Sequence, residues 1–136
     1  MRMAMIFLLL FGFLLVGCDT NDALGKVVPD VITDSVGLSG DSWHIQATGS
    51  GSKSRNFTLD AAQLLKVKAD NQFVGGSAKL TVTQTGVSPK TTVIHDKGIS
   101  QGTVDIDMTG FNPGVQLTMK VEVTNISGGQ TTISWE

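Results

Sequence analysis

Apolar and polar side chains alternate along most of the chain after residue 41, and this period of two predicts β-strands with one buried face. The pattern is clearest in the last third, where five apolar side chains share one face of residues 115–124: Val115, Leu117, Met119, Val121 and Val123. The same alternation predicts seven strands in all, at residues 43–48, 65–69, 78–83, 91–95, 104–108, 115–124 and 131–135.

Glycine-rich segments interrupt the alternation and predict the turns between these strands, most plainly at 49–52, 75–76 and 128–129. Residues 60–64 fit one helical turn, and no long amphipathic helix is present. Trp43 and Trp135 fall on the apolar faces of their strands and are expected to fill the core. An all-β chain of this kind is expected to form an antiparallel two-sheet sandwich of about seven strands.

Residues 65–104 are similar in rhythm to the immunoglobulin-like and fibronectin-like domains of bacterial surface proteins. The shared features are the apolar alternation, Gly75-Gly76 before a strand, and Asp96-Lys97-Gly98 before the next. The resemblance implies a sandwich for residues 42–136. A transthyretin-like or jelly-roll sandwich would show the same rhythm, and the chain has no Tyr and one Cys, so it lacks the tyrosine corner and the cysteine pair.

The chain begins with Arg2 and an apolar run of 14 residues, 3–16. A membrane-spanning helix needs roughly 20 apolar residues and a signal-peptide core about 7–15, so residues 1–17 are predicted to be a cleaved export signal. The run ends in Leu15-Val16-Gly17-Cys18, which resembles the lipobox of bacterial lipoproteins. That resemblance implies cleavage after Gly17, a diacylglyceryl group on the Cys18 sulfur and acylation of the new amino group. An ordinary exported cysteine and an uncleaved anchor are the alternatives.

The segment after the cysteine, residues 18–41, is predicted to be a lipidated N-terminus and tether, because it is rich in Asp, Gly and Ser. Part of it can pack on the domain as an edge strand, since Val28, Val31 and Ile32 are more apolar than a linker requires. Asp19 resembles the signal that keeps enterobacterial lipoproteins in the inner membrane, although it also fits a plain linker. We therefore expect the protein in the bacterial cell envelope, facing the periplasm, with the inner membrane favoured over the outer.

Charge and cysteine content narrow the function classes. Removal of residues 1–17 leaves 119 residues with nine of the ten basic side chains against twelve acidic ones. No basic stripe is present, so nucleic-acid binding has no electrostatic support. A single cysteine cannot form an internal disulfide, and stability must therefore come from core packing.

Few residues offer catalytic or metal-binding chemistry. His44 and His95 lack the spacing of a metal-binding motif. A zinc or copper site formed by His95-Asp96 with His44 is conceivable, but exposed imidazoles are the simpler interpretation. Asp105 and Asp107 are predicted to project from one strand face, where they could hold Ca²⁺ or simply be solvated. We expect no enzymatic activity and no cofactor.

Threonines dominate the predicted outer faces, at positions 58, 81, 83, 118 and 124. Such a face is ordinary for an exposed sheet and also suits contact with a partner. The leading hypothesis is a membrane-anchored lipoprotein whose domain acts as a protein-interaction or scaffolding module in the envelope. The alternative is a ligand-binding or metal-ion-binding periplasmic lipoprotein that uses the aspartates or histidines.

Overall fold

The computed structural model describes residues 30–98 and 101–136. The apolar run, the Leu15–Cys18 motif, Asp19 and the first half of the predicted tether, residues 18–29, lie outside the described residues, so lipidation and sorting stay predictions. No helix in the described part of the chain is long and apolar enough to cross a membrane.

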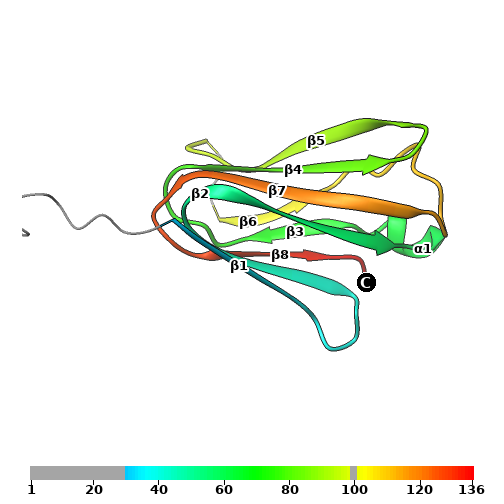
Figure 1. The fold of residues 1–136 in the computed structure, drawn as a ribbon, viewed down its shortest axis with the longest axis horizontal. Helices are drawn as coiled ribbons and strands as arrows, with labels where there is room; N and C mark the ends of the chain where they lie inside the picture. Colours follow the sequence, from blue (N-terminus) through cyan, green and yellow to red (C-terminus); the bar gives the residue numbers. More distant parts are fainter. Residues whose placement is uncertain (1–29, 99–100) are drawn as a thin grey trace, which may run out of the picture.

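The described residues form eight strands and one short helix (Figure 1). These elements are β1 (Val31–Val36), β2 (Ser42–Thr58), α1 (Ala61–Leu64), β3 (Lys68–Asn71), β4 (Ser77–Gln84), β5 (Val87–His95), β6 (Gly102–Asp105), β7 (Gln116–Ile126) and β8 (Gln130–Ser134).

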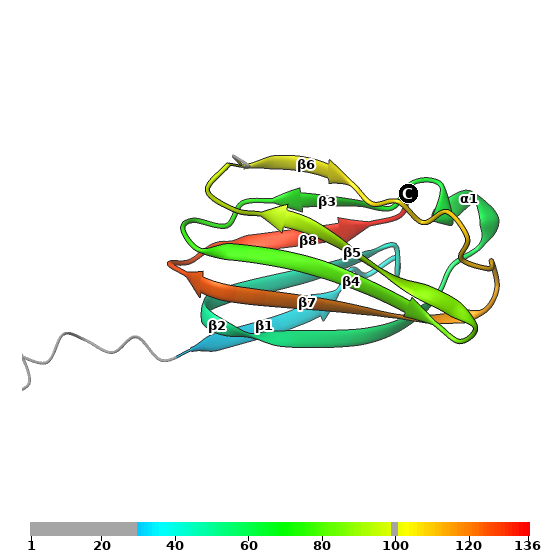
Figure 2. The same cartoon turned by 90° about the horizontal axis from the view of Figure 1, so that it is seen from above.

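All strand pairs are antiparallel, and seven strands form one sheet in the order β5-β4-β7-β2-β8-β3-β6. This sheet curls into a nearly closed barrel. The remaining strand, β1, pairs with β2 and stands outside this order of seven. Figures 1 and 2 show β5, β4 and β7 on one side of the core and β8, β3 and β6 on the other. The predicted two-sheet sandwich, immunoglobulin-like or transthyretin-like, is therefore wrong, because β2 belongs to both sides.

The segment Gly49–Ser52 explains this difference. It was expected to be a turn, but it lies within β2, which continues on both sides of it and is 17 residues long in all. The pairing of β2 with β7 shifts register between Gly49 and Gly51. Glycines at φ +83° and +157° let the strand bend there without ending. The first part of β2 pairs with β8 and the second with β7, so one strand connects the two sides of the barrel.

The hydrogen-bond ladder continues across the bend in the neighbouring strands as well. Val74 N donates to Gly128 O at 2.9 Å, and Ser127 N donates back to Val74 O at 2.8 Å. Ala47 N donates to Gly129 O at 3.1 Å. The links between β7 and β8 and between β3 and β4 are therefore paired parts of one bent sheet.

The core lies inside this curl and follows the predicted alternation. Trp43, Ile45 and Ala47 are buried, as are Leu117 and Met119. Trp43 and Trp135 are fully or almost fully buried, as expected, and the ring of Phe57 packs against both, with centroid distances of 5.7 and 4.7 Å. The alternation thus predicted most of the side chains that are inside. Val115 was also expected there but is 45% exposed, and the arrangement of the strands differed.

The helical turn expected at residues 60–64 is confirmed as α1. Asp60 is its N-cap: the carboxylate accepts from Gln63 N at 2.8 Å, and Gln63 Oε1 accepts from Asp60 N at 2.9 Å. Leu64 is buried, whereas Leu65, the C-cap, is 88% exposed. Leu65 was expected to begin a buried strand face, but β3 starts only at Lys68.

Candidate functional site

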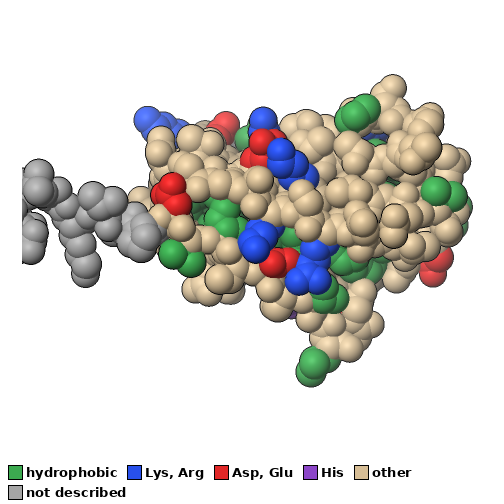
Figure 3. Space-filling model, in the orientation of Figure 1, with side chains coloured by type: hydrophobic (Ala, Val, Ile, Leu, Met, Phe, Trp, Pro, Cys, Tyr) green, Lys and Arg blue, Asp and Glu red, His purple; other side chains and the backbone are tan. Residues whose placement is uncertain are grey.

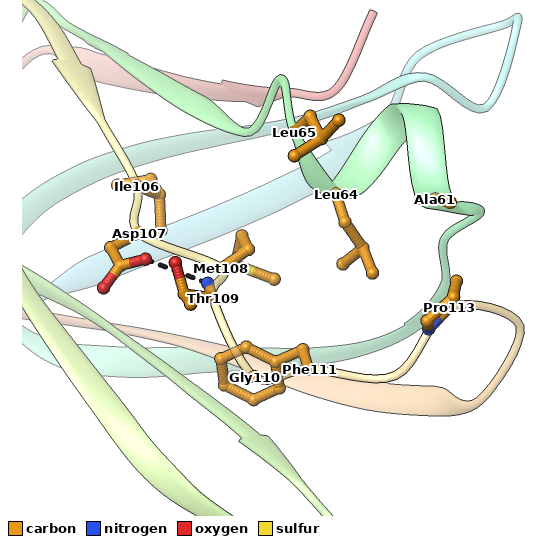
Figure 4. Close-up of a pocket in the computed structure, with 10 residues that line it drawn as sticks. All are labelled: Ala61, Leu64, Leu65, Ile106, Asp107, Met108, Thr109, Gly110, Phe111 and Pro113. Atoms are coloured by element: carbon orange, nitrogen blue, oxygen red, sulfur yellow. Dashed lines mark hydrogen bonds between the residues drawn. The ribbon is translucent and has the colours of Figure 1, made fainter.

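A shallow apolar pocket lies at one end of the barrel, between α1 and the segment before β7 (Figure 4). It measures about 490 Å³. Its lining comes from two segments, residues 61–65 and residues 106–113. Gly114 N donates to Leu59 O at 2.8 Å, which holds the ends of these segments together.

The pocket faces away from the end of the barrel at which the described chain begins. Asp30 lies against Gly49 at the bend, since a Cβ on Gly49 would fall 1.8 Å from its Oδ1. Figure 2 shows α1 and the segment before β7 at the opposite end from the start of β1. The start of β1 and the pocket therefore lie at opposite ends of the barrel.

Apolar side chains supply most of the pocket wall. Leu64, Met108 and Phe111 are 6–8% exposed and form its floor, and Leu65 stands exposed at its edge. An exposed leucine beside an apolar hollow favours contact with an apolar side chain of another molecule. This pocket was missed at the level of sequence because its two segments are about forty residues apart.

Asp107 supplies a carboxylate at the edge of this pocket. Lys90 Nζ donates to Asp107 Oδ2 at 2.7 Å, and Thr109 N donates to Oδ1 at 2.9 Å. The hydrogen bond from Lys90, followed by those from Thr109, holds the pKa of Asp107 well below its ordinary value. β6 ends at Asp105, so the two aspartates do not project from one strand as predicted. The carboxylate of Asp107 is instead neutralised by Lys90.

His95 is buried, contrary to the expectation of a solvated imidazole. Asn71 Oδ1 accepts from Phe73 N at 3.0 Å, so its Nδ2 is the donor that faces His95 Nδ1 at 2.8 Å. His95 Nε2 therefore carries the proton and donates to Gly75 O at 3.0 Å. The side chain joins β5 to β3 and to the link before β4, where it helps to close the barrel.

His44, in contrast, is exposed on β2, as predicted, and its Nδ1 lies 3.0 Å from Thr132 Oγ1. Within residues 30–98 and 101–136, no group of three or more His, Cys, Asp or Glu side chains is placed to hold a metal ion. His95 thus makes buried hydrogen bonds between strands, whereas His44 lies on the surface of β2.

The predicted threonine face is confirmed, since none of its five members is buried. Thr83 pairs with Thr118 across β4 and β7, and Thr118 Oγ1 donates to Asn56 Oδ1 at 2.7 Å. Thr81 and Thr91 join their hydroxyl groups at 2.9 Å. The hydroxyl groups of Thr81, Thr91 and Thr118 therefore hydrogen-bond to side chains of neighbouring strands.

A cluster of charges, which no sequence pattern predicted, lies where β1 meets β2. Asp34 Oδ2 accepts from Trp43 Nε1 at 2.9 Å and from Arg55 Nε, and Lys53 Nζ lies 3.7 Å from Oδ1. Figure 3 shows basic and acidic side chains in contact where β2 crosses the molecule. Burial raises the pKa of Asp34, but the hydrogen bonds from Arg55 and Trp43 and the two nearby cations outweigh it and lower the pKa below 3.8.

The Asp34→Asn variant should therefore be less stable than the wild type at neutral pH, by about 1–3 kcal/mol. The ionised carboxylate stabilises the fold above its unfolded pKa, and this stabilisation is lost as the pH falls through the lower folded value. The difference between the two proteins should accordingly shrink below about pH 4. Urea denaturation across this range measures it. The exposed Asp105→Asn is the control, and an equal response of both variants would contradict the assignment.

Comparisons with known proteins found no matching family model, no matching curated protein and no matching solved structure.

Proposed function

We propose that this protein is a lipid-anchored interaction module of the bacterial cell envelope, which binds a protein partner at the apolar end of its β-barrel. The anchor rests on the resemblance of Leu15–Cys18 to a lipobox, and Asp19 favours the inner membrane. Acyl chains on Cys18 would give lasting attachment, because each buried methylene contributes about 0.8 kcal/mol.

The observation that carries the proposal is the position of the pocket. A domain tethered through its N-terminus presents most freely the end that lies away from the tether, and this end holds the apolar pocket with Leu65 at its edge. The partner that fits is a protein segment with one or two apolar side chains, because the pocket wall is mainly apolar. Asp107, already paired with Lys90, leaves the edge close to neutral.

Photo-crosslinking in the native membrane tests the proposal. A photoreactive residue in place of Leu65 should capture a defined protein, whereas the same residue in place of Val93 should not. Val93 is the matched control because it is also exposed, at 45%, but lies on β5 outside the pocket. Leu65→Glu should weaken the partner's co-purification roughly tenfold or more. Equal capture at positions 65 and 93, or capture at neither, would argue against this site.

The anchor has its own test. The intact mass of protein extracted from its native membrane should equal residues 18–136 plus acyl chains, and Cys18→Ser should abolish both the added mass and the membrane attachment. A water-soluble, unmodified product would refute the anchor.

A second candidate is a ligand-binding lipoprotein, which the pocket's volume of about 490 Å³ favours. That volume lies within the roughly 300–1,000 Å³ of small-molecule sites. A thermal-shift screen of apolar compounds, with Met108→Lys as the blocked variant, separates this candidate from the protein-binding one.

A further inference from the structure

β1 covers an edge of the barrel while contributing little to its core. Among the described strands it pairs only with β2, in register from Val36 opposite Trp43 to Val31 opposite Thr48. None of its six side chains is buried, and Val31 and Val36 are 47% and 38% exposed. Ile32 alone among them packs partly against the core.

Two inward-facing side chains hold β1 in place. Ile32 lies over Gly51, where an added Cβ would come within 2.8 Å of its Cδ1. Asp34 binds Trp43 from the first part of β2 and Arg55 and Lys53 from the second part. β1 therefore bridges both parts of the bent strand through one apolar and one acidic side chain, two positions apart.

The surface beneath β1 is suited to an extended chain. Without β1, residues 43–48 would have a free backbone edge. Within the part of the chain that the structure describes, residues 49–58 already pair on one side only, with β7. The Trp43 indole N–H and the cations of Arg55 and Lys53 would then face the vacated strip. Backbone pairing supplies affinity at such an edge, and the side-chain contacts select the sequence.

We propose that this edge of β2 binds an extended segment of another protein, with an apolar residue followed two positions later by an acidic one, and that β1 occupies the site as a built-in competitor. The cations of Arg55 and Lys53 and the indole N–H of Trp43, which lie beside this edge, complement the carboxylate of the incoming segment. This site is separate from the apolar pocket, and the inference does not rest on the proposed function.

Peptide binding to the full chain tests the proposal. The probe is a fluorescent peptide of residues 30–36, and its control carries Asn in place of Asp34. The Asp34→Asn protein, whose own strand is held less firmly, should bind the acidic peptide roughly tenfold tighter than the wild type does, and tighter than the control peptide by a similar factor. Equal binding of both peptides to this variant, or no binding, would overturn the proposal.

A removable disulfide between β1 and β2 controls for the possibility that the Asp34→Asn protein binds peptide only because it is less stable. Thr33 and Gln46 are partners across β1 and β2, so Thr33→Cys with Gln46→Cys can fix β1 by a disulfide, with Cys18→Ser to remove the third thiol. Oxidation should abolish peptide binding and reduction should restore it. Peptide binding that is the same in the oxidised and reduced proteins would count against an external partner. So would a dimer that exchanges β1 between two copies and excludes the peptide.

Discussion

Replacement of Trp135 by alanine should lower the free energy of unfolding by about 3–5 kcal/mol. The side chain is 1% exposed, and its ring lies 4.7 Å from that of Phe57, which also contacts Trp43. Removing it would open a cavity in the core and take from Phe57 one of its two aromatic partners. Because the described domain has no disulfide to restrain it, this loss would be a large part of its total stability.

Urea denaturation followed by far-ultraviolet circular dichroism measures this effect without depending on tryptophan fluorescence. Leu65→Ala is the control, since the side chain is 88% exposed and its truncation should change stability by no more than about 0.5 kcal/mol. A loss below about 1 kcal/mol for Trp135→Ala would mean that the three rings do not form one packed cluster.

The period-two pattern predicted the core because burial of alternate side chains is a local property of a strand. It could not predict how the strands connect. A Gly-Ser-Gly-Ser segment satisfies a turn and a bulge equally well, and only the pairing of β2 with both β7 and β8 distinguishes them. The sandwich was expected for this reason, and the continuous bent sheet was not.

The candidate sites were hidden for a similar reason. His95 stands at the end of a predicted strand, and its burial depends on Asn71, a residue from another strand. Asp34 belongs to a segment with linker composition, and its role depends on Arg55 and Trp43. No local pattern contains such contacts, because they form only when strands distant in sequence are brought together.

The second prediction with a large expected effect concerns Gly76, which lies in the link before β4, beside the bend of the sheet. Gly76, at φ +63°, lies so close to the neighbouring strand that an added Cβ would fall 2.1 Å from Thr124 O and 2.5 Å from the carbonyl carbon of Asn125. Both are backbone atoms, which cannot rotate away as a side chain would. Gly76→Ala should therefore lower the free energy of unfolding by about 2–5 kcal/mol, from the left-handed conformation and the steric overlap together.

Gly86 provides a matched control that separates these two contributions. It has a similar φ of +78°, but no atom lies within 4 Å of an added Cβ. Gly86→Ala should thus cost only the conformational part, about 1–2 kcal/mol. Thermal and urea denaturation of both variants gives the difference between them, which reports the close approach at Gly76. If the two variants lost the same stability, β4 and β7 would not be packed so tightly beside the bend, and the continuity of the sheet across it would be in error.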